Sequence, residues 1–279
     1  TLCLDFRKTK DFVWLRFSHK GFGLIQKVVM DMEQIPGGVT APKGFRAAGI
    51  HAGIRKNKQK KDMALLVSDR DANVAGVFTQ NVVKAAPVLW DKKLCMETGK
   101  CRALVVNSGV ANACTGDAGY QDTEHIAAFA AQELGVPKDS VAVASTGVIG
   151  IRLPMDTIEQ GIQDLSNLLS DDIESGSAAA EAIRTTDICK KEIAVRLMIK
   201  GRNVTIGGMC KGSGMINPNL GTVLAFLTTD LNIGQNLLEK TLQADVLDTY
   251  NMLSVDGDTS TNDTVMTVSY THLTLPTTS

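Results

Sequence analysis

Short apolar runs alternate with longer amphipathic segments along this chain, and that alternation restricts its fold more than any other feature. The apolar runs are bounded by charges and turn residues, which is typical of strands. We expect such strands at residues 64–68, 74–79, 103–107 and 141–145, and a hairpin over 193–199 and 202–206.

The amphipathic segments carry apolar residues three or four positions apart, as helices with one buried face do. We expect helices over 121–134, 156–169, 175–183 and most of 233–253. Strand pairs that alternate with helices predict an α/β fold of stacked mixed sheets flanked by helices.

The composition suits a globular domain and argues against several classes of partner. A chain of 279 residues that is 44% hydrophobic can bury a full core. A net charge of −1 and an aromatic content of 5% argue against general binding to nucleic acid or to a membrane surface. No run of about 18 apolar residues is present, so no transmembrane helix is predicted.

The six cysteines are scattered, without a Cys-x-x-Cys pair and without a histidine spacing suited to zinc. We therefore predict no metal site. A reducing compartment fits this pattern best: the cytoplasm, or the mitochondrial matrix if the source is a eukaryote.

Both ends differ in character from the middle of the chain. Residues 1–29 mix charges and aromatics without a clear period, and Met30 or Met32 is a plausible start, so we expect a non-native leader there. Residues 268–279 break off after a strand-like segment and are expected to be a foreign tail on a truncated chain.

A glycine-punctuated polar loop at 211–222 delivers one threonine to an apolar strand at 223–230. Glycine permits positive φ and Pro218 fixes its own φ, so the loop is suited to an unusual path. Its glycines lack the order of a P-loop or of a dinucleotide fingerprint, which argues against a nucleotide site.

Thr222 has two interpretations that its own sequence leaves open: ordinary strand filler, or a nucleophile released by cutting the Gly221–Thr222 bond. A threonine hydroxyl needs a base. A new α-amine on Thr222, with a reference pKa of about 7.7–8.0, could accept its proton near neutral pH. Gly221 would let the hydroxyl approach the preceding carbonyl closely.

Eight blocks in a fixed order carry a resemblance to a known family. They are TAPKGF (40–45), FTQ (78–80), AAPV (85–88), NSGVANACTG (107–116), STGVIG (145–150), TTD (185–187), residues 207–230 and DGDTSTND (256–263). Together they make the chain resemble the ornithine acetyltransferase (glutamate N-acetyltransferase) family of arginine biosynthesis.

The resemblance implies an αββα sandwich of the N-terminal-nucleophile type and a precursor that cleaves itself between Gly221 and Thr222. The α region would be 30–221 and the β region would begin with 222–267. The family commonly has alanine before the threonine, so Gly221 is a departure. Thr222 would take the acetyl group from N2-acetylornithine and pass it to glutamate through an acetyl-threonine intermediate.

Further site residues follow from the same resemblance. Thr146 and Gly147 would form the oxyanion hole, although a plain strand-ending turn also explains them. Thr185, Lys211 and Thr222 would contact substrate, with Lys211 anchoring a carboxylate; a solvated loop lysine is the alternative for that residue. The family's remaining substrate contacts lie in the C-terminal part of the β chain, beyond this sequence.

No cofactor is implied, and the use of acetyl-CoA as a co-substrate stays open. The expected partners are the protein's own α and β fragments, assembled as an α2β2 heterotetramer. Two other functions remain as alternatives: an N-terminal-nucleophile aminopeptidase or amidohydrolase, and a non-catalytic protein in which Thr222 is only structural.

Overall fold

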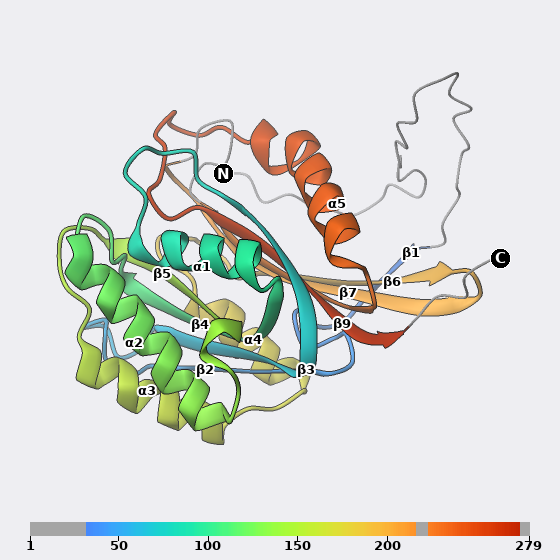
Figure 1. Cartoon of the computed structure of the whole chain (residues 1–279), viewed down its shortest axis with the longest axis horizontal. Coiled ribbons are helices and arrows are strands. Elements are labelled where there is room, and N and C mark those ends of the chain that lie inside the picture. The colour runs from blue at the N-terminus through green and yellow to red at the C-terminus, as the bar shows by residue number, and fades with distance from the viewer. Residues whose placement is uncertain (1–31, 216–222, 274–279) are drawn as a thin grey trace.

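A computed structural model describes residues 32–215 and 223–273, the side chains of 271–273 excepted, and Figure 1 shows its architecture. The described residues form nine strands joined into one mixed sheet. The strands are β1 (Met32–Ile35), β2 (Phe45–Ile50), β3 (Met63–Phe78), β4 (Lys100–Val110), β5 (Val141–Val148), β6 (Lys191–Ile199), β7 (Arg202–Lys211), β8 (Leu224–Leu231) and β9 (Thr264–Leu273). Their order is β1-β6-β7-β8-β9-β3-β4-β5, with β2 also paired to β3.

The long strand β3 joins two halves of this sheet. Its first part pairs with β2, to Ser68, and its last part pairs with β9, from Ala72. Strand β4 pairs with the other edge of β3, to Val67 and again at Ala72 and Asn73. The register shifts between Val67 and Ala72, where the exposed charged residues 69–71 interrupt the apolar pattern. The two strands expected at 64–68 and 74–79 are therefore one interrupted strand.

Side chains alternate between the two faces of each strand, and the residues that each face packs against show that the two halves form separate layers. One cluster of buried residues combines Leu66, Leu104 and Ala144 from the first half with Phe226 and Met266 from the second. The intervening residues of the first half pack under helices α2 (Gly116–Leu134) and α3 (Met155–Asn167). Those of the second half pack under helix α5 (Gln235–Asp248), on the opposite side of the molecule (Figure 1). Helix, sheet, sheet and helix thus follow one another, which confirms the predicted layers.

Helix α1 (Ala86–Glu97) covers the edge of the sheet at β5. Trp90 Nε1 donates to the Val141 carbonyl at 2.8 Å, and the Val143 N–H donates to Asp91 Oδ1 at 2.8 Å. These side chains occupy the backbone groups that an open edge would expose. The sequence did not predict this helix, because its apolar residues are not confined to one face: Asp91 is buried, whereas Leu89 and Met96 are exposed.

The other helices lie close to their predicted positions. Helix α2 begins five residues before the predicted 121, helix α4 covers Ile173–Ala182, and α5 ends at Asp248 before a short 3-10 turn, Tyr250–Met252. None of the helices in the described ranges is long and apolar enough to cross a membrane. Strand β9 crosses position 268 without interruption, and the foreign-tail and leader assignments stay predictions; residues 1–29 lie outside the described part.

Candidate active site

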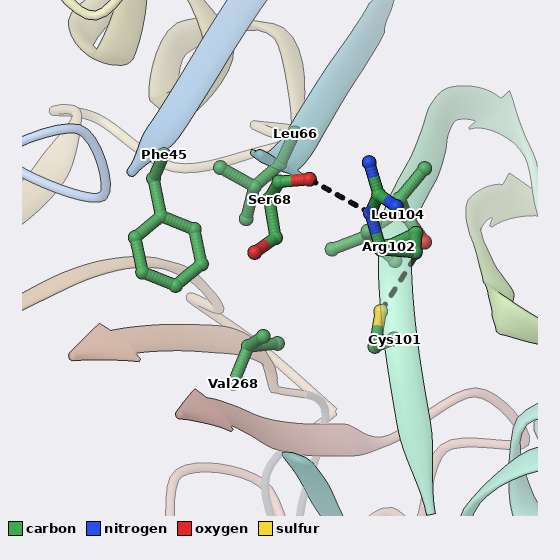
Figure 2. A pocket seen from close by; sticks show the side chains of 8 residues that line it. Phe45, Leu66, Ser68, Cys101, Arg102, Leu104 and Val268 are labelled. Carbon is green, nitrogen blue, oxygen red and sulfur yellow. Dashed lines mark hydrogen bonds between the residues drawn. The ribbon is translucent and has the colours of Figure 1, made fainter. Parts of the chain in front are cut away.

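Two hollows differ greatly in size and lining. Figure 2 shows the first, a gap of about 10 Å³ whose walls include Phe45, Leu66 and Val268, so it has room for about one water molecule and no metabolite. The second is an open cleft of about 600 Å³, within the range of small-molecule sites. We therefore place the candidate site in the second.

The cleft lies where β4 and β5 end and where four loops approach them. Its walls combine Gly109, Ala111 and residues 146–149 with Arg55, Lys60, Thr185, Thr186, Lys211, residues 213–215 and several residues of 256–262. It thus brings together Thr146, Gly147, Thr185 and Lys211, which the sequence separates by up to 65 positions. Gly221 and Thr222 lie outside the described residues.

The ends of β4 and β5 are fixed by close backbone packing. Gly109 and Gly147 are register partners in this parallel pair, with φ of 120° and 137°. A Cβ on Gly147 would overlap the carbonyl of Gly109, so only glycine fits there. Asn262 Nδ2 donates to the carbonyls of Ala111 (2.7 Å) and Ser145 (2.8 Å), which holds both strand ends from a third segment. Thr146 is consequently held rigidly at the cleft wall.

Lys211, the last residue of β7, is 3% exposed although its side chain lines the cleft. Burial lowers the pKa of its ammonium, and the carboxylates of Asp187 and Asp263 oppose that shift. No hydrogen bond of its ammonium is found within residues 32–215 and 223–273. The solvated-lysine alternative is therefore wrong, and a cation buried at a cleft is suited to hold an anion.

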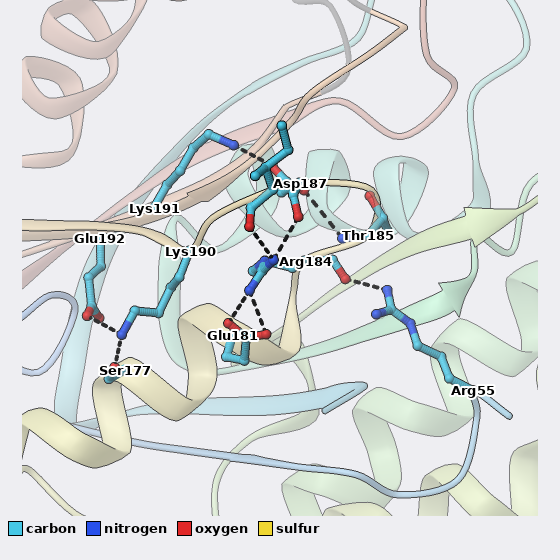
Figure 3. Close-up of polar contacts among 10 residues, drawn as sticks. Arg55, Ser177, Glu181, Arg184, Thr185, Asp187, Lys190, Lys191 and Glu192 are labelled. Carbon is cyan, nitrogen blue, oxygen red and sulfur yellow. Dashed lines mark hydrogen bonds and ion pairs between the residues drawn. The ribbon is translucent and has the colours of Figure 1, made fainter. Parts of the chain in front are cut away.

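Asp187 connects Thr185 to the loop that follows Lys211 (Figure 3). Its Oδ1 accepts the Gly212 N–H at 2.8 Å and a hydrogen bond from Lys191, and its Oδ2 accepts the Thr185 N–H at 3.4 Å. Burial alone would raise the pKa of Asp187, but the Lys191 ammonium and the Gly212 N–H together hold it below its ordinary value. An ionised carboxylate thus sets the spacing between the two candidate substrate contacts.

Arg184 supports the same loop from behind. Its guanidinium pairs with both oxygens of Glu181, at 2.7 and 2.6 Å, and donates to the Asp187 carbonyl at 2.7 Å (Figure 3). The Arg184 carbonyl in turn accepts a hydrogen bond from Arg55. Arg55 and Lys60, which belong to the basic run 55–61, both line the cleft. Within the described ranges, no three His, Cys, Asp or Glu side chains are grouped to hold a metal ion.

The family model that matches the sequence is that of the ArgJ family, over residues 46–276. The chain belongs to the ArgJ family. This confirms the resemblance to ornithine acetyltransferases, and it confirms the fold expected from it.

Named relatives agree with the family assignment. The chloroplastic arginine biosynthesis bifunctional protein ArgJ of Physcomitrium patens is 47% identical over 234 residues, 84% of this chain and 45% of the relative. The ArgJ bifunctional protein of Symbiobacterium thermophilum is 51% identical over 236 residues, 84% of this chain and 58% of the relative. The chain therefore spans about half the length of the curated ArgJ proteins it matches.

Two solved ArgJ-type structures share the fold. The arginine biosynthesis bifunctional protein of Bacillus halodurans is 39% identical with a TM-score of 0.64. The ornithine acetyltransferase of Mycobacterium tuberculosis, solved with ornithine, is 42% identical with a TM-score of 0.63. Each alignment covers 70% of this chain and 100% of the solved chain.

Within this ArgJ-family chain, sequence reasoning identified four residues that line one cleft but missed the residues that hold them. Asp187 had an available signal, because an aspartate two residues after Thr185 can accept a local backbone N–H. Asn262 had none, since its bonds join segments more than 110 positions apart.

Proposed function

We propose that the complete gene product moves an acetyl group from N2-acetylornithine to glutamate, yielding ornithine and N-acetylglutamate. The supporting observation is the cleft itself. In an ArgJ-family chain, it unites a rigid Thr146–Gly147 strand end with a buried cation, Lys211, and the Asp187-held Thr185. A relative solved with ornithine is 42% identical to this chain.

The nucleophile in this proposal is Thr222, freed by self-cleavage at Gly221–Thr222. Its Oγ attacks the acetyl carbonyl while its α-amine takes the hydroxyl proton. The Thr146 hydroxyl and the Gly147 N–H stabilise the oxyanion, and the intermediate collapses as the protonated ornithine amine leaves. The glutamate amine then attacks the acetyl-threonine ester, and Thr222 regains its proton.

Lys211 and Thr185 bind the amino-acid part of each substrate. The buried ammonium of Lys211 pairs with the α-carboxylate, which both substrates share, and Thr185 donates or accepts a hydrogen bond beside it. A common carboxylate anchor explains how one cleft serves N-acetylornithine and then glutamate in turn.

The assembly, the cofactor requirement and the compartment belong to the same proposal. We infer that α and β fragments stay together as an α2β2 heterotetramer and that transfer needs no metal or organic cofactor. Acetyl-CoA is a candidate second acetyl donor. The compartment is the cytoplasm of a bacterial source; plant relatives are named chloroplastic, so a plastid replaces the mitochondrial matrix for a plant source.

The test combines the intact mass of the complete gene product with an assay of N-acetylornithine, with and without glutamate. We expect two fragments separated before Thr222 and glutamate-dependent formation of N-acetylglutamate that survives dialysis against EDTA. Thr222→Ala should abolish both cleavage and transfer. Ornithine release that never yields N-acetylglutamate would favour an amidohydrolase, and one uncut, inactive wild-type chain would favour a non-catalytic protein.

A further inference from the structure

Asp263 contacts the backbone directly beside position 222. It lies just before β9, is 1% exposed, and its Oδ1 accepts the Val223 N–H at 3.0 Å. That nitrogen belongs to the peptide bond joining residue 222 to Val223. The carboxylate therefore holds the first described peptide group after the proposed nucleophile.

Val223 is held from both sides. Its carbonyl accepts the Thr264 N–H at 2.9 Å, while its N–H is taken by Asp263. Asp263 is itself fixed, because its own carbonyl accepts the Thr79 N–H at 2.9 Å from the end of β3. Three backbone segments thus determine where the chain re-enters β8.

Asp263 keeps one oxygen unused. Within the described part of the chain, Oδ2 is buried without a hydrogen bond of ordinary geometry. Burial raises the pKa of Asp263 to about 7, opposed by the Val223 N–H, the Lys211 ammonium and the Ser260 hydroxyl. The charge of Asp187 raises the pKa of Lys211, and the charge of Arg55 lowers it. Burying a carboxyl group that accepts few hydrogen bonds costs free energy of folding. This cost argues that Asp263 does more than stabilise the fold.

We propose that Asp263 is the positioning residue of the nucleophile: its ionised carboxylate holds the N–H of Val223, the residue bonded directly to Thr222. This inference rests on the proposed function. Once the chain is cut before Thr222, no covalent bond restrains that residue from upstream. Its one remaining covalent link to the chain is then the bond to Val223, and holding Val223 reduces the conformational freedom that must be lost before each attack.

The matched experiment replaces two buried acids in the complete gene product. Asp263→Asn removes the charge and keeps the shape. Asp230→Asn is the control, because Asp230 is 4% exposed and its Oδ1 accepts the Thr205 N–H at 2.9 Å, near the opposite end of β8. We expect kcat per cleaved molecule to fall at least tenfold in Asp263→Asn, with KM for N-acetylornithine within twofold, and to stay within twofold in Asp230→Asn.

The pH profile separates positioning from mere stabilisation. If the α-amine must be neutral and Asp263 must be ionised, both groups have to lose a proton, and log kcat of the wild type rises with a slope approaching 2 below pH 6. In Asp263→Asn the slope should fall to 1. If Asp263→Asn does not fold, the wild-type slope still decides: a slope of 1 contradicts the role.

The outcomes for the two hypotheses differ. An active wild type with an equally active Asp263→Asn variant and an unchanged slope overturns the role of Asp263 alone. A wild type that neither cleaves nor transfers overturns the proposed function, and this role with it. A folded Asp263→Asn variant that remains uncut supports the role, since the scissile threonine is then also misplaced.

Discussion

At the residue scale, Lys211 is the one cation of the described cleft wall that is almost completely buried. A buried ammonium is costly unless it meets an opposite charge. Asp187 and Asp263 supply part of that charge, and the open cleft beside Lys211 leaves room for a substrate carboxylate. The residue is therefore expected to matter for binding rather than for the chemistry at Thr222.

Lys211→Met should raise KM for both N-acetylornithine and glutamate at least tenfold, because an apolar side chain of similar length cannot pair with a carboxylate. Self-cleavage, which involves no substrate carboxylate, should persist. Steady-state kinetics and intact mass measure both quantities. The control is Lys58→Met, an exposed lysine in the loop between β2 and β3. Equal effects in the two variants would contradict the anchor.

At the scale of elements, the parallel pair of β4 and β5 depends on two glycines facing each other. Gly147 combines positive φ with contact against the Gly109 backbone, whereas Gly150 has φ of 79° and open space where a Cβ would stand. The two positions thus separate backbone strain from overlap within one short segment.

Gly147→Ala should destabilise the protein clearly more than Gly150→Ala. A left-handed alanine costs about 1–2 kcal/mol at either site, and the overlap with Gly109 adds about 1–3 kcal/mol at Gly147 alone. Urea unfolding of the two variants gives the difference directly. A smaller loss at Gly147 than at Gly150 would show that the strand ends can separate without penalty.

The elements also show what the sequence could predict and why the rest was hidden. Periodicity located α3 because it has one buried face, and the Lys200–Gly201 turn located the β6–β7 hairpin; both signals are local to the segment. Helix α1 escaped because its role is to cap β5 through Trp90 and Asp91, a contact across about 50 positions. In the site, motif residues were found, but the bonds of Asn262 were not, since such contacts exist only after folding.

At the scale of the whole molecule, several carboxyl groups are buried in the interior, where their charged form is disfavoured. Burial raises the pKa of Asp263 to about 7, the pKa of Asp91 well above its ordinary value, and that of Asp230 in the same direction. Between the ordinary pKa of an aspartate and the raised pKa of each of these groups, the unfolded chain has released the proton while the folded chain retains it. Stability must then fall as pH rises through this window.

The urea midpoint of the wild type should therefore be higher at pH 5 than at pH 7, contrary to the behaviour of proteins dominated by surface ion pairs. Asp263→Asn should flatten this slope, because it removes one proton that the folded state retains. Unfolding curves at three pH values between 5 and 7 measure both effects. A midpoint that rises with pH would mean that these acids are ionised when folded.

The sheet order has a consequence for the proposed cut before Thr222. Strands β8 and β9 both follow that point in sequence, yet they lie between β7 and β3, which precede it. The downstream piece is thus threaded into the upstream one, with ladder hydrogen bonds along both of its flanks. Dilution should not dissociate the two fragments, and fragments from differently labelled molecules should not exchange without complete unfolding. The nicked protein would melt once, as a single cooperative body.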